Sequence, residues 1–374
     1  MATRVWVAAA TQPDLVMQAL ILAGGEGTRL RPLTSTVPKP VVPILDRPHL
    51  VHMADWLKRF GVDDVILACG HMADGIREIA GDGTSLGIRL RYVEEPEPRG
   101  TGGAIKEAES LLDDQFLVFN GDILADLDLA PLLAHHEQTG AAATIGLIAV
   151  EDPSAFGVVV TAEDGSVEAF IEKPPRDEAP TNLVNAGVYV IEKRVLEGIT
   201  PEQNVSIERE VFPALTGNGL HAIEVAGYWL DIGTPGRYLE AHWDLLDGTL
   251  GGGTGLDGGP GGVSLGFDCE VDGEVNGPAW LDDEVKVAAG ASVGPRAVIG
   301  AGGVIAVGAE IVDSVLLAGV EVGAGAKITG TVIASNAKIG ENVTAGPDVV
   351  IGEGAIVPAG TTLEPGARVA PEVS

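Results

Sequence analysis

The chain has 374 residues and carries 54 Asp and Glu against 23 Lys and Arg, a formal net charge of −31. Nucleic acid and anionic membrane surfaces are therefore not expected as partners, because both need a basic face on the protein. Hydrophobic residues make up 45% of the sequence, which is enough for the cores of two or three domains.

The first part of the chain alternates short apolar runs with stretches of helical length. Met17 stands directly before the first apolar run, so residues 1–16 are expected to form an N-terminal extension. Between 17 and 247 the alternation predicts βαβ units, and hence an α/β domain on a doubly wound, mostly parallel, Rossmann-like sheet. The expected strands cover 19–22, 64–68, 116–120, 142–150 and 187–191, and the expected helices cover 50–60, 103–112 and 129–139.

The second part begins after a glycine-rich stretch, 248–262, which is predicted to be a linker because so many glycines cannot hold a packed element. From 263 to 374 aliphatic residues recur every six positions, from Leu281 to Val369, with two steps of five. A helix needs a period of about 3.6 and an isolated strand one of about 2. The pattern therefore predicts a parallel β-helix with three strand-and-turn units per coil. Its resemblance to hexapeptide-repeat proteins implies the left-handed form.

A candidate phosphate-binding loop lies near the start, where residues 21–40 read ILAGGEGTRLRPLTSTVPKP. Its glycines let backbone N–H groups approach phosphate oxygens without a Cβ in the way. The Arg29 guanidinium can clamp those oxygens in a bidentate fashion, and Lys39, held between two prolines, adds a point charge on a stiff loop. The spacing matches neither a Walker loop nor a dinucleotide fingerprint.

Further motifs follow in a fixed order along the chain. They are Asn120-Gly121-Asp122, Phe156-Gly157-Val158, Glu172-Lys173-Pro174, Asn185-Ala186-Gly187 and Trp229-Leu230-Asp231-Ile232-Gly233. These motifs, the glycine-rich loop and Pro38-Lys39-Pro40 together resemble the pattern of the sugar-1-phosphate nucleotidylyltransferases. The resemblance extends from about residue 17 to 369. The resemblance implies an enzyme that joins a nucleoside triphosphate to a sugar 1-phosphate and releases pyrophosphate.

The resemblance also implies roles for individual residues. Asp122 and Asp231 would hold Mg²⁺ together with the nucleotide phosphates, and carboxylates at strand ends suit that cation. Arg29 would stabilise the leaving pyrophosphate, and Lys39 would contact the nucleotide phosphates or the sugar phosphate. The implied nucleotide-binding residues are Leu22, Gly24, Gly25, Gly27, Thr28, Glu95 and Gly100. The implied sugar-phosphate residues are Lys173 for the phosphate, Glu172 and Asn185 for sugar hydroxyls, and Gly157.

The segment 92–104, YVEEPEPRGTGGA, bears on which base is read. Glu95 aligns with a position that is often Gln in uridylyl- and thymidylyltransferases. A carboxylate accepts from the N1–H and 2-amino donors of guanine, whereas uracil and thymine suit an amide. The segment resembles mannose-1-phosphate guanylyltransferases, although Arg99 stands where Leu is usual. Heptose-1-phosphate guanylyltransferases and glucose-1-phosphate thymidylyl- or uridylyltransferases remain alternatives.

The function of the repeat domain is the less specific part of the prediction. Hexapeptide acyltransferases generally use a His base, and all seven His precede Gly248, so a second acyltransferase activity is not expected. Stacked coils offer flat faces, so a homo-oligomer formed through the β-helix is expected. A non-catalytic regulatory paralogue is the alternative from another class. Such a paralogue would be expected to lack some of the residues that bind phosphate or metal in the family, and in this sequence all of them are present.

Composition also bears on the compartment. Cys69 and Cys269 have neither metal-binding nor redox spacing and are expected to be reduced thiols in a cytoplasmic protein. No apolar run approaches the roughly 20 residues that a membrane span needs. Only 8 of the 23 basic residues are Lys. This favours a high-salt cytosol, in which exposed charges are screened within about 3 Å at 1 M salt.

Overall fold

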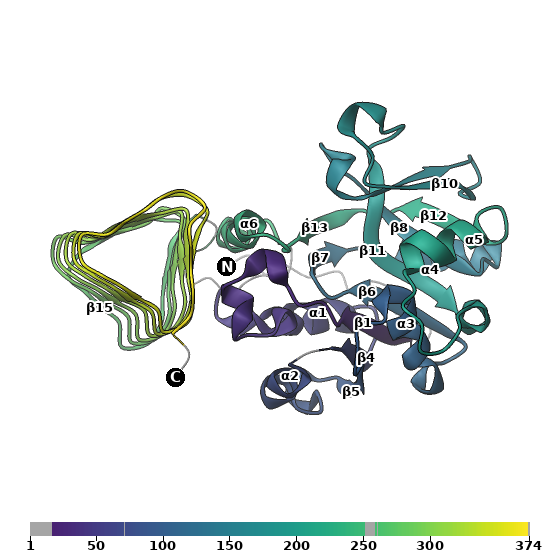
Figure 1. Cartoon of the computed structure of the whole chain (residues 1–374), viewed down its shortest axis with the longest axis horizontal. Helices are drawn as coiled ribbons and strands as arrows, with labels where there is room; N and C mark the ends of the chain where they lie inside the picture. The colour runs from purple at the N-terminus through teal and green to yellow at the C-terminus, as the bar shows by residue number, and fades with distance from the viewer. Residues whose placement is uncertain (1–16, 71, 251–258, 260, 373–374) are drawn as a thin grey trace, which may run out of the picture.

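The computed structural model describes residues 17–70, 72–250, 259 and 261–372, and Figure 1 shows two parts, an α/β part and a triangular coil stack. The α/β part is built on a nine-stranded sheet in which β10-β9-β11-β6-β1-β4-β5 lie side by side, while β8 pairs with β11 and β12 pairs with β8. These strands are β1 Gln18–Ala23, β4 Asp64–Cys69, β5 Arg89–Glu94, β6 Gln115–Asn120, β8 Ala143–Ala149, β9 Gly157–Thr161, β10 Val167–Glu172, β11 Leu183–Glu192 and β12 Leu220–Glu224.

The sheet is mixed rather than uniformly parallel. Strands β6, β1, β4 and β5 run parallel, as do β12 and β8. Strand β11 is antiparallel to β6 and β8, and β9 and β10 form an antiparallel pair. The Rossmann-like α/β prediction is confirmed. The antiparallel arm was not predicted, because β9 and β10 are short and half-buried and lack a helix between them.

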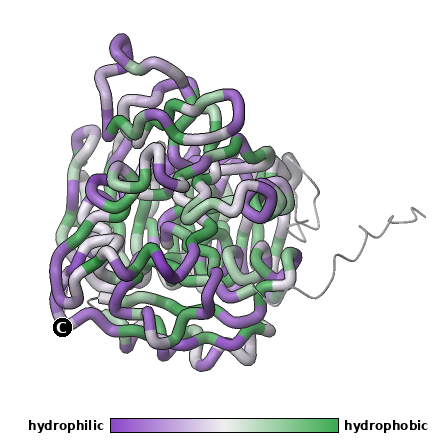
Figure 2. Tube along the Cα trace, turned by 90° about the vertical axis from the view of Figure 1, so that its right-hand side faces the viewer, coloured by the Kyte–Doolittle hydropathy of each residue, from purple (hydrophilic) through white to green (hydrophobic). Residues whose placement is uncertain are grey.

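Helices cover both faces of the sheet. They are α1 His49–Lys58, α2 Ala73–Ala80, α3 Gly100–Glu107, α4 Ala130–Thr139, α5 Phe212–Leu215 and α6 Pro235–Leu246. Successive residues of the central strands alternate between two cores, as Leu20 and Ile21 do on β1. This double burial explains why these strands read as continuous apolar runs. Hydrophobic stretches pass through the body of this part and hydrophilic ones lie mostly on its outer loops (Figure 2).

Two of the predicted helices, 50–60 and 129–139, agree with α1 and α4 to within two residues at each end, and the third differs more. The helix predicted over 103–112 begins at Gly100 and ends at Glu107, and a separate 3₁₀ turn, Glu109–Leu111, follows it. Its glycine-rich start is poor in helix propensity, yet it is held by Val205, whose carbonyl accepts from the N–H groups of Gly102 and Gly103 at 2.8 and 3.2 Å. Tertiary contact therefore sets this helix start.

The C-terminal part is a parallel β-helix, as predicted, and is consistent with the left-handed hexapeptide form. One of its sheets has seven strands, β14 Val263–Leu265, β17 Ala279–Leu281, β20 Ala297–Ile299, β23 Val315–Leu316, β26 Thr331–Ile333, β29 Val349–Ile351 and β32 Arg368–Val369. A second has β15 Glu270–Val271, β18 Lys286–Val287, β21 Val304–Ile305, β24 Glu321–Val322, β27 Lys338–Ile339 and β30 Ile356–Val357. The third has β16 Glu274–Val275, β19 Ser292–Val293, β22 Glu310–Val312, β25 Lys327–Thr329, β28 Thr344–Ala345 and β31 Thr362–Leu363.

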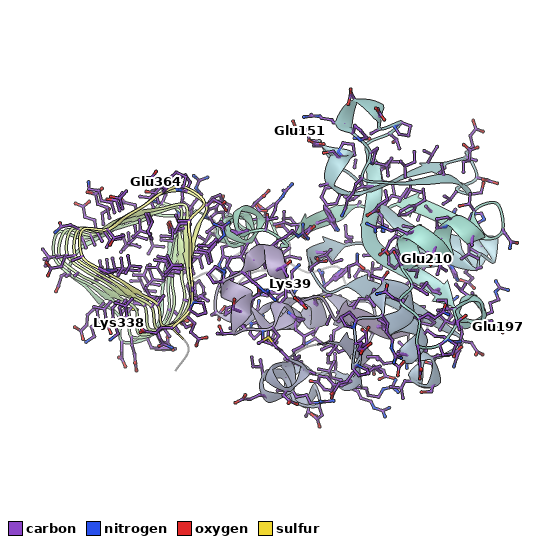
Figure 3. The ribbon with its side chains drawn as sticks, viewed as in Figure 1. Lys39, Glu151, Glu197, Glu210, Lys338 and Glu364 are labelled. Carbon is purple, nitrogen blue, oxygen red and sulfur yellow. The ribbon has the colours of Figure 1, made fainter. Side chains whose placement is uncertain are left out.

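The predicted aliphatic column fills the inside of the triangle. Its residues from Leu281 to Val357 are buried, and only Leu363 and Val369 in the last coil are partly exposed. Charged side chains such as Lys338 and Glu364 point outward from the coils (Figure 3). Each of the five basic residues of this part pairs with an acid on the neighbouring coil.

The outer face of the seven-stranded sheet packs against the α/β part. Val298, Val315, Val332 and Val350 share one apolar cluster with α6 and with the segment around Val42. At the edge of this contact the Trp243 indole N–H donates to the carbonyl of Arg296 at 3.2 Å, and the Arg296 guanidinium lies over the Trp243 ring at 4.6 Å. The two parts therefore share a hydrophobic interface.

Two predicted segments fall wholly or mostly outside the described residues. The N-terminal extension, 1–16, lies outside them, as does most of the linker, 248–262. Within the described ranges, none of the helices combines the length and the apolar character that crossing a bilayer requires.

Candidate active site

A cleft of about 420 Å³ opens at the carboxyl ends of β1, β4 and β6, which is where open α/β sheets bind ligands. Ten residues singled out in the sequence line it. They are Leu22, Gly24, Gly25, Gly27, Thr28, Arg29, Lys39, Glu95, Gly100 and Asp122. The sequence therefore identified most of the wall of this cleft.

The glycine-rich loop follows β1 directly and turns back along the cleft. Gly27 has a φ of 60°, a conformation that favours glycine, and its carbonyl accepts from the Thr34 hydroxyl at 2.7 Å. A Cβ on Gly24 would come within 3.0 Å of Glu95 Oε1. The loop therefore lies directly against the segment that carries Glu95.

The loop that carries Lys39 is anchored on both sides. Val41 is buried in the core beneath the sheet, and Val42 in the cluster shared with the β-helix. The Lys39 side chain is only 10% exposed, and its Nζ donates to Asp122 Oδ2 at 2.8 Å. Figure 3 places Lys39 near the centre of the molecule, on the side of the α/β part that faces the β-helix.

Two aspartates far apart in sequence meet beside this lysine. Strands β7 (Ile123–Leu127) and β13 (Gly227–Asp231) form an antiparallel pair in which Ile123 faces Asp231. The carbonyl of Asp122 accepts from the N–H of Ile232 at 2.9 Å, and Asp231 Oδ1 accepts from the N–H of Gly233 at 2.7 Å. This pairing places Asp231 next to the cleft.

Their electrostatics differ. Burial alone would raise the pKa of Asp122, but the Lys39 ammonium and the Arg29 guanidinium hold it below its usual value. Burial, and then the negative charge of Asp122, raise the pKa of Asp231. A divalent cation would relieve the repulsion between these two carboxylates, so their oxygens fit a hard metal ion. Across the described residues, no group of three or more His, Cys, Asp or Glu side chains is placed to hold a metal ion.

Glu95 lies on the opposite wall of the cleft and is 9% exposed. Its Oε2 accepts from the N–H of Arg99 at 3.0 Å, and burial raises the pKa of its carboxyl. The Arg99 guanidinium instead pairs with Glu107 on α3. Arg99, which stands where Leu is usual, therefore contacts Glu95 through its backbone N–H, while its guanidinium forms an ion pair with Glu107.

The predicted sugar-phosphate residues form a second group that does not line this cleft. The register of β10, β9 and β11 puts Glu172 opposite Gly157, with Asn185 next along on β11. Asn185 Nδ2 donates to the Tyr189 hydroxyl at 2.8 Å, and its Oδ1 accepts from the N–H of Gly187 at 2.8 Å. Lys173 Nζ lies 3.7 Å from Glu172 Oε1 and is exposed.

Two polar residues near the site, Asn120 and Arg209, were not predicted from the sequence to have a functional role. Asn120 lines the cleft, and its buried Oδ1 has no hydrogen-bond partner. The motif Asn120-Gly121-Asp122 contained this signal, but only the aspartate was assigned. Arg209 lies 3.7 Å from Glu172 Oε1, and no motif marks it.

Comparisons with known proteins agree with this geometry. The sequence pattern of the nucleotidyl transferase family matches residues 18–248, and that of the GMPPB C-terminal domain matches 275–372. Mannose-1-phosphate guanylyltransferase of Mycobacterium tuberculosis is 42% identical over 236 residues, which cover 62% of this chain and 65% of that protein. The catalytic subunit beta of the same enzyme from Xenopus tropicalis is 42% identical over 229 residues, 60% of this chain and 63% of that protein. The match thus spans just under two thirds of these curated relatives.

A solved structure resembles the α/β part. HddC from Yersinia pseudotuberculosis, complexed with GMP-PN, is 30% identical with a TM-score of 0.54, and the match covers 61% of this chain and 99% of that one.

Proposed function

Since the chain belongs to the nucleotidyl transferase family, we propose that it transfers a guanylyl group from GTP to mannose 1-phosphate, releasing pyrophosphate and forming a nucleotide-sugar. The observation that carries this proposal is the cluster of Arg29, Lys39, Asp122 and Asp231 at one cleft. The names of the two relatives and the guanine nucleotide analogue in the HddC structure support guanine and mannose.

The reaction needs positioning and charge neutralisation rather than a protein nucleophile. A phosphate oxygen of the sugar 1-phosphate attacks the α-phosphorus, the bond to the bridging oxygen breaks, and pyrophosphate leaves with that oxygen. Arg29 stabilises the charge that builds on the leaving group, and the glycine loop holds the phosphates through its N–H groups. Lys39 neutralises phosphate charge from the other side of the loop, while Glu172, Asn185 and Gly157 accommodate the sugar.

Asp122 and Asp231 would hold the cofactor, which we propose to be Mg²⁺. When bound, this cation supplies positive charge to the phosphoryl oxygens of the nucleotide. The Lys39 ammonium, which donates to Asp122 Oδ2 at 2.8 Å, neutralises part of the negative charge of this carboxylate.

The experiment that tests the function is a panel of nucleotides and sugars. Pyrophosphate release is measured for GTP, UTP, dTTP, CTP and ATP with mannose, glucose and heptose 1-phosphates, with and without Mg²⁺. The expected result is Mg²⁺-dependent turnover that favours GTP and mannose 1-phosphate. Preference for UTP or dTTP with glucose 1-phosphate would support the thymidylyl- or uridylyltransferase alternative. A preference for heptose 1-phosphate would support the heptose enzyme, and no turnover would support a regulatory paralogue.

Glu95 is expected to read guanine. Replacing it in Glu95→Gln should lower the preference for GTP over UTP by about 10- to 100-fold, because the amide offers a donor where guanine needs an acceptor. The measurement is kcat/KM for each nucleotide at saturating sugar 1-phosphate. Glu94→Gln, next in sequence and paired with Arg77 at the surface, is the matched control and should keep the wild-type ratio. An unchanged ratio in Glu95→Gln would contradict this role.

Activity is expected to survive or rise at high salt. A chain of net charge −31 repels anionic substrates at long range, and screening shortens that repulsion from about 10 Å at 0.1 M to about 3 Å at 1 M. The measurement is kcat/KM in a KCl series at constant free Mg²⁺. A steep loss above physiological ionic strength would count against adaptation to a salty cytosol.

The remaining partners and the location of the protein are part of the same proposal. The substrates are small molecules, and the free faces of the β-helix support a homo-oligomer. The reduced cysteines and the nucleotide substrates support a cytoplasmic location, in which GTP is available.

A further inference from the structure

The second sheet of the β-helix, which begins at β15, is turned away from the α/β part in Figure 1, and Lys338 points outward from it in Figure 3. In each of its two-residue strands the first residue is exposed and the second faces the core. The strands pair in register, so the outward residues stack in one straight row about 4.8 Å apart. In chain order this outer row is Glu270, Lys286, Val304, Glu321, Lys338 and Ile356.

The outer row is complementary to itself about Val304. A second copy turned by 180° about an axis that runs along β21, between the two faces, presents its coils in the reverse order. Val304 then faces Val304 of the second copy. Lys286 faces Glu321 of the second copy, and Glu270 faces Lys338 of the second copy. Because symmetry repeats the last two contacts, every charged residue of the row meets an opposite charge and none meets a like charge.

The centre of this contact is apolar and its rim is charged, as in protein–protein interfaces generally. Val304 is 39% exposed, and packing against its symmetry mate would remove that aliphatic surface from water. Within one copy, Lys286 Nζ donates to Glu270 Oε1 at 2.9 Å, and Lys338 Nζ lies 3.2 Å from Glu321 Oε1. In the pair of copies each lysine would therefore lie between two carboxylates, one from each copy.

The other two sheets of the β-helix offer less. The first sheet is covered by α6 and the segment around Val42. The outer row of the third sheet contains one ion pair, Glu310 with Lys327, and none of the exposed large aliphatic side chains of the described residues belongs to that sheet. Apolar surface and charge complementarity thus coincide on the second sheet.

We propose that two copies of this chain associate through the outer row of the second sheet, with Val304 on the twofold axis. This inference rests on the homo-oligomer of the proposed function and names the face that forms it. The same face is used by both copies, so the assembly closes at a dimer. Since most of its contacts are charge pairs, the dimer should weaken as salt screens them.

The test is sedimentation velocity of the full chain at about 0.1 M KCl, where such pairs are least screened. The wild type should form a dimer. Lys338→Glu places two Glu–Glu contacts across the interface and should raise the Kd of the dimer by about 10- to 100-fold. The matched control is Lys327→Glu, which makes the same charge change and breaks the equivalent ion pair on the third sheet. Its Kd should stay within about twofold of the wild type. A monomeric wild type, or equal effects of the two variants, would overturn the inference.

A mixing experiment separates contact between copies from an effect within one chain. Glu270→Lys alone places two Lys–Lys contacts across the interface and should also weaken the dimer. When Glu270→Lys and Lys338→Glu are mixed in equal amounts, both outer contacts join opposite charges again, so a heterodimer should form. Misfolding of either variant could not be repaired by mixing, and a mixture that stays monomeric would overturn the inference. Sedimentation does not require turnover, so its outcome is independent of whether pyrophosphate release supports the proposed reaction.

Discussion

Replacing Asp122 by Asn is expected to lower kcat by about 10³-fold or more, because it removes a carboxylate that we propose to hold the divalent cation at the nucleotide phosphates. The pKa of Asp122 is held below its usual value, so its charge is present throughout the neutral range. Asn keeps the shape of the side chain and removes that charge. Steady-state kinetics of the full chain with GTP and mannose 1-phosphate measure the effect.

The matched control for this change is Asp126→Asn. Asp126 lies on β7, the strand that begins directly after Asp122, but it pairs with Arg59 and does not line the cleft, so the kcat of the variant should stay within about twofold of the wild type. Binding of Mn²⁺ in the presence of a non-hydrolysable GTP analogue gives a second readout. Asp122→Asn should bind the ion more weakly, and Asp126→Asn should not. Full turnover by Asp122→Asn would contradict the assignment of this carboxylate.

Replacing Ile333 by Ala is expected to cost about 2–5 kcal/mol of stability, because the side chain is fully buried and its removal leaves a cavity. Ile333 lies on β26 in the middle of the aliphatic column, between Leu316 and Ile351 of the neighbouring coils. The coils above and below hold the backbone of this coil in place, so the neighbouring side chains cannot move in to fill the cavity. Urea denaturation of the full chain measures the change.

Ile356→Ala is the control for this effect. Ile356 belongs to the same β-helix, but it points outward from β30 and is 59% exposed. Its replacement should change the free energy of unfolding by about 0.5 kcal/mol or less. Equal losses at the two positions would mean that the inward-facing column is not what holds the coils together.

The period of the sequence was sufficient to predict the β-helix. Each coil repeats the same local pattern, so the inward positions from Leu281 to Val357 could be named one by one. The five-residue steps did not interrupt the column, because Ile311 and Leu316 are buried in one core with Ile333. Because the same short pattern repeats in every coil, the sequence alone predicts which residues far apart in the chain stack on one another.

The candidate site was predictable only in part. The glycine loop, Arg29 and Lys39 lie within a few residues of each other, so one motif revealed them. The meeting of Asp122 with Asp231 depends on the pairing of β7 with β13, which no local pattern encodes. Arg209 is positioned by a turn whose form depends on contacts with α3, and those contacts could not be anticipated from its own sequence.

The apolar cluster that contains Val42 connects the β-helix to the segment that carries Lys39. Among the described coils, the central ones contribute to the cluster that also contains Val42, through Val298, Val315, Leu317, Val332, Ala334 and Val350. Coils toward either end of the stack make no such contribution to that cluster beyond Trp280. The segment that carries Lys39 is therefore held by both parts of the chain, because Val41 is buried in the core of the α/β part and Val42 in the cluster shared with the β-helix.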